Sequence, residues 1–179
     1  MRLVVLFMLP SLLGAQATAP VQASPSVGER ALTYRGFALA APYADFTRRA
    51  RALAAPGADP LVCNTSRHTA QLMECGELIQ DPADSTGFYL AAYMLEGRVA
   101  FLSFGDSGGA PLVERMQRDL VTRFGRPRGS RAGMWEWRSG REWVRLSWRA
   151  RGPARWIYVA LWDESLMNRI GHYVPRRPR

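Results

Sequence analysis

Apolar residues at helical spacing mark the first element of the folded chain. Four of them recur three or four positions apart and share one stripe of an α-helix, namely Tyr43, Phe46, Ala50 and Leu53. Pro42 suits the first helical position, and the Pro-Gly pair at 56–57 ends the pattern. The pattern predicts a helix from Pro42 to about Leu53, preceded by a short strand at 36–39.

Three runs rich in strand-forming residues follow this helix. They cover Thr69–Gly76, Phe88–Leu95 and Arg98–Phe104. The last two are separated only by Glu96-Gly97, and a two-residue loop with Gly between such runs is a strong hairpin signal.

The same order of elements then recurs. A second apolar stripe predicts a helix from Pro111 to Phe124, which Gly125 caps and Pro127 prevents from continuing. Three more strands are expected at Met134–Arg138, Glu142–Arg149 and Arg155–Trp162. Their turns lie at 139–140 and 151–153.

The predicted fold class follows from this order of elements. We expect an α+β fold of two helix-plus-three-strand repeats, with an antiparallel sheet and the helices on one face. One domain is predicted at 35–170, with similar halves at 35–105 and 106–170.

The ends of the chain lack this periodicity. A positive start, an almost unbroken apolar run from Leu3 to Leu13, and small residues up to Ala23 are typical of a secretory signal peptide at 1–23. The run is too short to span a bilayer of about 30 Å. Retention of this segment as an anchor stays open, as does the cleavage site. A flexible lead-in at 24–34 and a basic tail at 171–179 complete the expected organisation.

The charge of the chain limits the classes of partner that it is expected to bind. The formal net charge is +9, and arginine supplies all 24 basic residues because the chain has no lysine. Arginine is typical of sites that bind carboxylates or phosphates through two parallel hydrogen bonds. Since export argues against nucleic acid, we expect an acidic protein, an anionic glycan or a lipid headgroup.

The two cysteines, Cys63 and Cys75, predict one disulfide. An exported chain meets an oxidising environment, where an even pair is typically bonded. Only His68 lies nearby as a further metal ligand, so a metal site is disfavoured. The sequence contains no Gly-rich phosphate loop and no His cluster at metal spacing, so no cofactor is expected.

A family resemblance rests on the second half. A helix ending in Phe124-Gly125-Arg126-Pro127 and leading into a Trp-bearing meander resembles modules of exported bacterial proteins, namely the β-lactamase inhibitor protein group and the small lipoproteins of outer-membrane assembly. The resemblance covers 37–163 and implies protein binding without enzymatic activity. The chain lacks a lipid-attachment Cys after the apolar run, and only one half has the Gly-x-Pro ending.

One segment carries a candidate catalytic motif. Residues 105–112 read Gly-Asp-Ser-Gly-Gly-Ala-Pro-Leu, which resembles the nucleophile loop of trypsin-like serine proteases. His68 would have to act as base, with Asp81 or Asp84 to orient it. An inserted Ala, the short spacing to His68 and the helix that follows favour another interpretation, in which Asp106 or Ser107 caps that helix. Hydrolysis by Ser107 is kept as an alternative.

The last two strands carry the candidate binding surface. Strand alternation places Trp143 and Arg145 on one face of their strand, and Trp156 and Tyr158 on one face of the next. Either these residues stabilise the sheet by cross-strand packing, or they bind a partner, since Trp, Tyr and Arg are enriched at binding hot spots.

Two further features are interpreted as structural. His172 is expected to be a surface residue of the tail, and Asp163-Glu164 a solvated turn rather than a cation site. The sequence therefore favours a non-catalytic binding module in the periplasm or outside the cell, with a protein partner in the envelope. The alternatives are an anionic glycan or lipid-headgroup binder and a serine hydrolase.

Overall fold

The computed structural model describes residues 32–54, 57, 61–66, 69, 71–80, 87–151 and 154–173. The predicted signal peptide at 1–23, most of the lead-in, and tail residues 174–179 lie outside this part. So do His68, Asp81 and Asp84.

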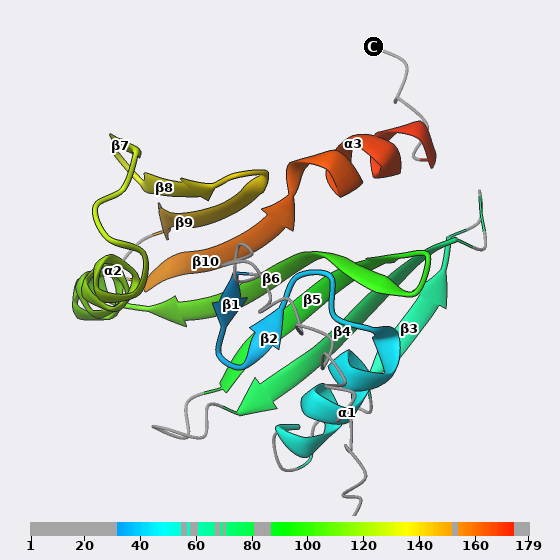
Figure 1. Cartoon of the computed structure of the whole chain (residues 1–179). Helices are drawn as coiled ribbons and strands as arrows, with labels where there is room; N and C mark the ends of the chain where they lie inside the picture. Colours follow the sequence, from blue (N-terminus) through cyan, green and yellow to red (C-terminus); the bar gives the residue numbers. More distant parts are fainter. Residues whose placement is uncertain are drawn as a thin grey trace, which may run out of the picture.

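The chain is an α+β protein with a large antiparallel sheet (Figure 1). Strands β1 (Thr33–Tyr34) and β2 (Phe37–Ala38) form a small separate sheet. The large sheet has eight strands in the order β3-β4-β5-β6-β10-β9-β8-β7. These are β3 (Val62–Thr65), β4 (Leu72–Gln80), β5 (Gly87–Leu95), β6 (Arg98–Gly108), β7 (Gly129–Arg131), β8 (Met134–Ser139), β9 (Glu142–Arg151) and β10 (Ala154–Asp163). The helices are α1 (Tyr43–Ala52), α2 (Ala110–Phe124) and α3 (Glu164–Tyr173).

Two meanders of four strands meet where β6 pairs with β10. Helix α1 precedes the first meander and α2 precedes the second. Each meander has one strand more than expected, because β3 and β7 are short edge strands of four and three residues. The predicted turn at Glu96-Gly97 is present, and both residues have the positive φ that such a hairpin requires, 52° and 74°.

The main core lies between α1, α2 and one face of the sheet. Phe46 and Ala50 of α1 and Val113, Met116 and Leu120 of α2 are buried against inward residues of the strands. Trp137 fastens the end of α2 to β8, because its indole Nε1 donates a hydrogen bond to the Gly125 carbonyl at 2.8 Å. Gly125 caps α2 with a φ of 76°, as the sequence predicts.

Helix α3 packs on the opposite face of the sheet. Ile170, with Leu166 and Met167 beside it, covers a separate buried cluster that includes Leu72 and Leu95. Leu95 lies one residue after Met94, which is in the main core, and strand alternation therefore turns it to the other side. Figure 1 shows α3 continuing from the end of β10, away from α1. The expectation that all helices lie on one face is thus wrong for α3.

The starts of two helices also differ from the predictions. Pro42 is the N-cap of α1 rather than its first helical residue. Gly109 is the N-cap of α2, without a side-chain cap, so neither Asp106 nor Ser107 caps that helix. The reason is that β6 continues through Gly108 and keeps both residues in the sheet.

Within the described residues, no helix combines the length and the apolar character needed to cross a membrane.

Candidate binding face

The side of the large sheet opposite α1 and α2, here called the open face, carries most of the exposed large apolar side chains among the described residues. Tyr89 is 55% exposed, Trp156 48% and Tyr158 41%. Val62 and Leu78 share this face, and only Val121, on α2, lies elsewhere. Large exposed apolar patches of this kind are typical of interaction sites, which makes this face the candidate binding surface.

Cross-strand register aligns the residues of the open face in rows that run across the sheet. One row contains four aromatic residues on adjacent strands, called here the aromatic row: Trp143, Trp162, Phe101 and Tyr93. Arg138 continues the row at one end, and Glu74 and Asn64 continue it at the other.

The Trp143 end of the aromatic row is held by stacking. The rings of Trp143 and Trp162 are parallel within 2°, with centroids 5.9 Å apart. The Arg138 guanidinium lies 4.8 Å from the centroid of Trp143, and that of Arg145 lies 4.9 Å from the centroid of Trp162. These are cation–π distances, so this part of the row stabilises the sheet.

Small side chains form the next row of the open face, called here the trough, which is hollowed over β4 and β5. They are Gly76, Ala91, Ser103 and Ala160, on four adjacent strands. A second ridge beyond the trough contains Tyr89 and Tyr158, each four residues from a member of the aromatic row on its own strand. Four residues of strand span roughly 13 Å between Cα atoms.

Two glycines let the tyrosines of the second ridge lie down on the sheet. A Cβ at Gly76 would be 2.1 Å from the Tyr89 hydroxyl, and one at Gly105 would be 3.2 Å from the Tyr158 ring. Each ring therefore occupies the space that a side chain at its neighbouring glycine would fill. These two glycines allow the rings to approach the sheet closely, and neither serves a turn here.

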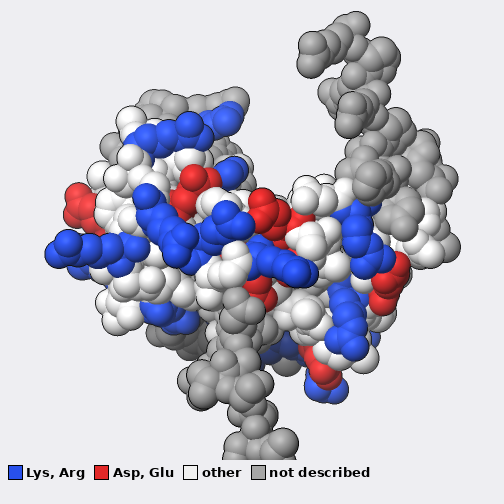
Figure 2. Space-filling model, turned by 45° about the horizontal axis from the view of Figure 1, so that its top comes forward, with Lys and Arg blue, Asp and Glu red and all other residues white. Residues whose placement is uncertain are grey.

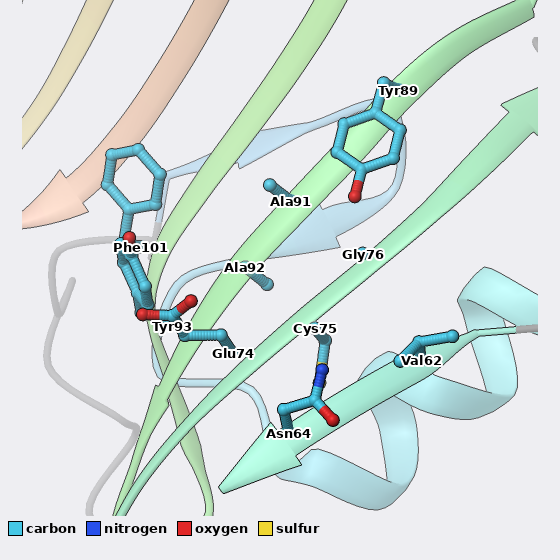
Figure 3. A pocket seen from close by; sticks show the side chains of 10 residues that line it. All are labelled: Val62, Asn64, Glu74, Cys75, Gly76, Tyr89, Ala91, Ala92, Tyr93 and Phe101. Carbon is cyan, nitrogen blue, oxygen red and sulfur yellow. The ribbon is translucent and has the colours of Figure 1, made fainter. Parts of the chain in front are cut away.

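One hollow opens at the β3–β6 end of the trough (Figure 3). This tyrosine hollow has a volume of about 240 Å³. Tyr93, Phe101 and Glu74 gather on one side of it and Tyr89 lies on the other, with its hydroxyl over Gly76 and with Ala91 between the two sides. Asn64 and Val62 of β3 complete the wall. Burial, and to a lesser extent the Glu74 carboxylate, raise the pKa of Tyr93.

A second hollow lies on the β9–β10 side. This arginine hollow has a volume of about 420 Å³ and is lined by Ser147, Arg149, Trp156 and Tyr158. Arg149 is directly opposite Trp156 in register, and it is exposed. A guanidinium beside two half-exposed aromatic rings suits a carboxylate or another anion joined to an apolar group.

Charge is unevenly distributed over the open face. Arg145 pairs with Glu136 at 2.7 Å, and Arg138 pairs with Glu164 at 2.9 Å. Within the described part of the chain, Arg149 and Glu74 form no ion pair. The face thus offers a basic group at one end and an acidic group at the other. Elsewhere arginine dominates, and in Figure 2 blue side chains cover more of the visible surface than red ones.

The four predicted site residues share the open face but do not form one cluster. Trp143 is opposite Trp162, while Trp156 is opposite Arg149, six residues further along the same pair of strands. This separation is roughly 20 Å. Trp143 and Arg145 belong to the stacked part of the aromatic row, and Trp156 and Tyr158 line the arginine hollow.

The serine motif is part of a strand. Ser107 is exposed on β6 opposite Trp156, and its backbone N–H donates to the Asp106 carboxylate at 2.6 Å. The other members of the hypothetical triad, His68 and Asp81 or Asp84, lie outside the described residues.

Asp163 and Glu164 start a helix, and the expectation of a solvated turn is wrong. The Asp163 carboxylate accepts hydrogen bonds from the Ser165 hydroxyl at 2.5 Å and from the Leu166 N–H at 2.9 Å, which makes it the cap of α3. His172 lies in α3 rather than in a frayed tail. No group of three or more potential metal ligands occurs in the part of the chain that the structure describes.

The predicted disulfide is present and borders the tyrosine hollow. Cys63 and Cys75 are directly opposite each other on β3 and β4, with Cα atoms 4.1 Å apart. The bond fastens β3, an edge strand with only one neighbour, and so holds Val62 and Asn64 in the wall of the hollow.

Sequence analysis missed the β4–β6 half of the open face. The signal was present, because alternation within Phe88–Leu95 sets Tyr89, Ala91 and Tyr93 on one side of the strand.

Comparisons with family models, with curated proteins and with solved structures find no match to this chain.

Proposed function

We propose that this chain is an exported, non-catalytic binding module whose open face binds an acidic partner protein in the cell envelope. The observation that carries the proposal is the concentration of exposed Trp156, Tyr158 and Tyr89 on a sheet face that α1 and α2 leave uncovered. Tyr and Trp are enriched at binding hot spots, and large exposed apolar patches are uncommon on monomers.

Charge complementarity supports an acidic partner. The chain has a net charge of +9, and Arg149, which forms no ion pair with any residue that the structure describes, lies in a hollow beside two aromatic rings. Arg131, which is also exposed, lies in the row of Tyr158, beyond Ser147 and Met134. A partner carboxylate that enters the arginine hollow would gain a charge-assisted hydrogen bond and contact with two aromatic rings.

The proposed location and architecture fit this interpretation. The disulfide is compatible with an oxidising compartment, which agrees with the signal-peptide pattern at 1–23. We also interpret the two halves as copies of one unit, supported by the helix before each meander and the pairing of the last strands, β6 and β10. This architecture is compatible with the resemblance to tandem modules of exported inhibitors and assembly lipoproteins.

A photo-crosslinking amino acid tests the proposal in cells. Placed at Tyr158, it should capture one acidic envelope protein, identified by mass spectrometry, when the chain is expressed at native level. Placed at Val121, the exposed apolar residue of α2, it serves as a matched control. Capture of the same protein only from position 121, or no specific protein from position 158, would contradict the proposal.

An anionic glycan or lipid headgroup is the second candidate, favoured by Arg149 in one hollow with Trp156 and Tyr158. Aromatic rings stack on sugars, and a guanidinium binds sulfate, phosphate or carboxylate. Binding through an exposed arginine would weaken steeply with salt, whereas a partner held mainly by apolar contacts would not. Vesicles containing anionic lipid and a sulfated glycan, each titrated at two salt concentrations, separate the two candidates.

A further inference from the structure

We propose that the tyrosine hollow binds an organic cation, a guanidinium or an alkylammonium group. The inference goes beyond the proposed function, because the hollow would take this group from an arginine or lysine of a partner protein or from a free amine. It rests on the aromatic walls, the carboxylate and the size of the hollow.

Aromatic rings stand on both sides of the hollow. Tyr93 and Phe101 form one wall, with ring centroids 5.4 Å apart, and Tyr89 forms the other (Figure 3). The face of an aromatic ring carries negative potential, and several rings around one space form a recognised site for ammonium and guanidinium groups.

A carboxylate without a cation completes the site. Glu74 is opposite Tyr93 in register and lines the hollow. It is exposed and forms no ion pair with any residue that the structure describes. Burial and, to a lesser extent, the Glu74 carboxylate raise the pKa of Tyr93, so the Tyr93 phenol stays neutral beside this carboxylate.

The size of the hollow selects a small group. Ala91 lies between the two aromatic sides, the Tyr89 hydroxyl lies over Gly76, and the volume is about 240 Å³. Drug-sized ligands occupy pockets of about 300–1,000 Å³, whereas a guanidinium with its short alkyl stem needs less. Asn64 at the rim adds a side-chain carbonyl that can accept a hydrogen bond from the cation.

The other hollow of the open face provides an internal control. The arginine hollow has two aromatic residues against three in the tyrosine hollow, and it contains Arg149 in place of a carboxylate. Because its charged group is basic, it should repel cations.

The test uses ethylguanidinium, n-butylammonium and tetramethylammonium against the full mature chain, followed by two-dimensional NMR. N-ethylurea, which matches ethylguanidinium in shape but is neutral, is the control probe. We expect saturable shifts at the amides of Gly76 and Ala91, with a Kd on the order of millimolar, and none at Arg149. N-ethylurea should cause no saturable shift. Strongest binding of ethylguanidinium or n-butylammonium points to a side chain as the source, and strongest binding of tetramethylammonium points to a free quaternary amine.

Substitutions of exposed residues test which side chains bind the cation. Glu74→Gln should weaken ethylguanidinium binding about two- to fivefold, the range expected for an exposed ion pair. Tyr89→Ala should weaken it by a similar factor, and Trp156→Ala should leave it unchanged. If Tyr89→Ala does not fold, as judged by circular dichroism, Glu74→Gln still decides the question.

Equal binding of ethylguanidinium and N-ethylurea, unchanged affinity in Glu74→Gln, or no shift at Gly76 and Ala91 would each overturn the inference. None of these outcomes involves the partner protein. Failure of the cation site is therefore distinguishable from failure of the proposed function, which the crosslink at Tyr158 tests.

Discussion

Replacing Trp143 or Trp156 with Ala should separate the structural part of the open face from its binding part. Trp143 loses its stack with Trp162, centroid distance 5.9 Å, and the Arg138 guanidinium 4.8 Å from its ring. An aromatic pair contributes about 0.5–1.5 kcal/mol and an exposed cation–π contact about 0.5–1 kcal/mol. Together with the partial loss of apolar burial, Trp143→Ala should lower the free energy of unfolding by about 2–3 kcal/mol. Truncation of a fully buried Trp lowers it by about 3–5 kcal/mol.

Trp156 is 48% exposed, and no ring contact of it occurs among the described residues. Trp156→Ala should therefore change the free energy of unfolding by less than about 1 kcal/mol. Urea unfolding followed by circular dichroism measures both variants. With a slope of about 1–3 kcal/mol per molar urea, Trp143→Ala should lower the midpoint by about 1 M or more.

A double-mutant cycle between Trp143 and Trp162 isolates the stack. We expect a coupling free energy of about 0.5–1.5 kcal/mol. A coupling near zero, or a Trp156→Ala variant as destabilised as Trp143→Ala, would refute the division of the face into a stabilising stack and a free binding surface.

Three further substitutions test the fold and its electrostatics. Replacing Cys63 and Cys75 with Ala should lower the free energy of unfolding by about 3 kcal/mol for a bond that spans 12 residues, as measured by urea unfolding; a loss below about 1 kcal/mol contradicts this. Asp163→Ala removes the cap of α3 and should cost about 1 kcal/mol, with faster amide exchange confined to α3 and the cluster under it. Burial raises the pKa of the Glu77 carboxyl, an effect that Arg51 opposes, so the folded state holds this proton more tightly than the unfolded state. That contribution to stability is full below the unfolded pKa of about 4.3 and is lost as the pH rises through the raised folded pKa. The free energy of unfolding of Glu77→Gln should therefore increase relative to that of the native chain between pH 4 and pH 8. If the two free energies differ by the same amount at both pH values, burial does not perturb Glu77.

Periodicity in the sequence predicted much of the fold. Apolar stripes identify α1 and α2, and alternation over five or six residues identifies each long strand. Both patterns arise because the two faces of each element lie in different environments. Strands β3 and β7 were missed because four and three residues are too few to show alternation.

Helix α3 was missed for a different reason. Leu166, Met167 and Ile170 have helical spacing after a capping Asp163, but the Pro- and Arg-rich residues that follow suggested a tail. Its position on the opposite face depends on Leu72 and Leu95, which α3 covers. Only the assembled sheet shows that these two residues would be exposed without α3.

The site could be predicted only in part. Alternation in β9 and β10 shows that Trp156 and Tyr158 can share a face, and a single strand pair is enough for that inference. The pairing of β6 with β10 brings together residues from both halves of the chain, and no local pattern encodes it. The trough spans that pairing, whereas the tyrosine hollow depends on the register of β3, β4, β5 and β6 within the first half.

The affinity of the chain for the protein captured at Tyr158 tests the central claim most directly. Isothermal titration with the purified partner would compare the native chain, the Trp156→Ala/Tyr158→Ala variant and the Val121→Ala control. The open-face account predicts a loss of at least about 30-fold, or about 2 kcal/mol, for the double variant, and no more than a twofold change for Val121→Ala. Equal affinity of the native chain and the double variant would contradict the claim that the open face is the binding surface.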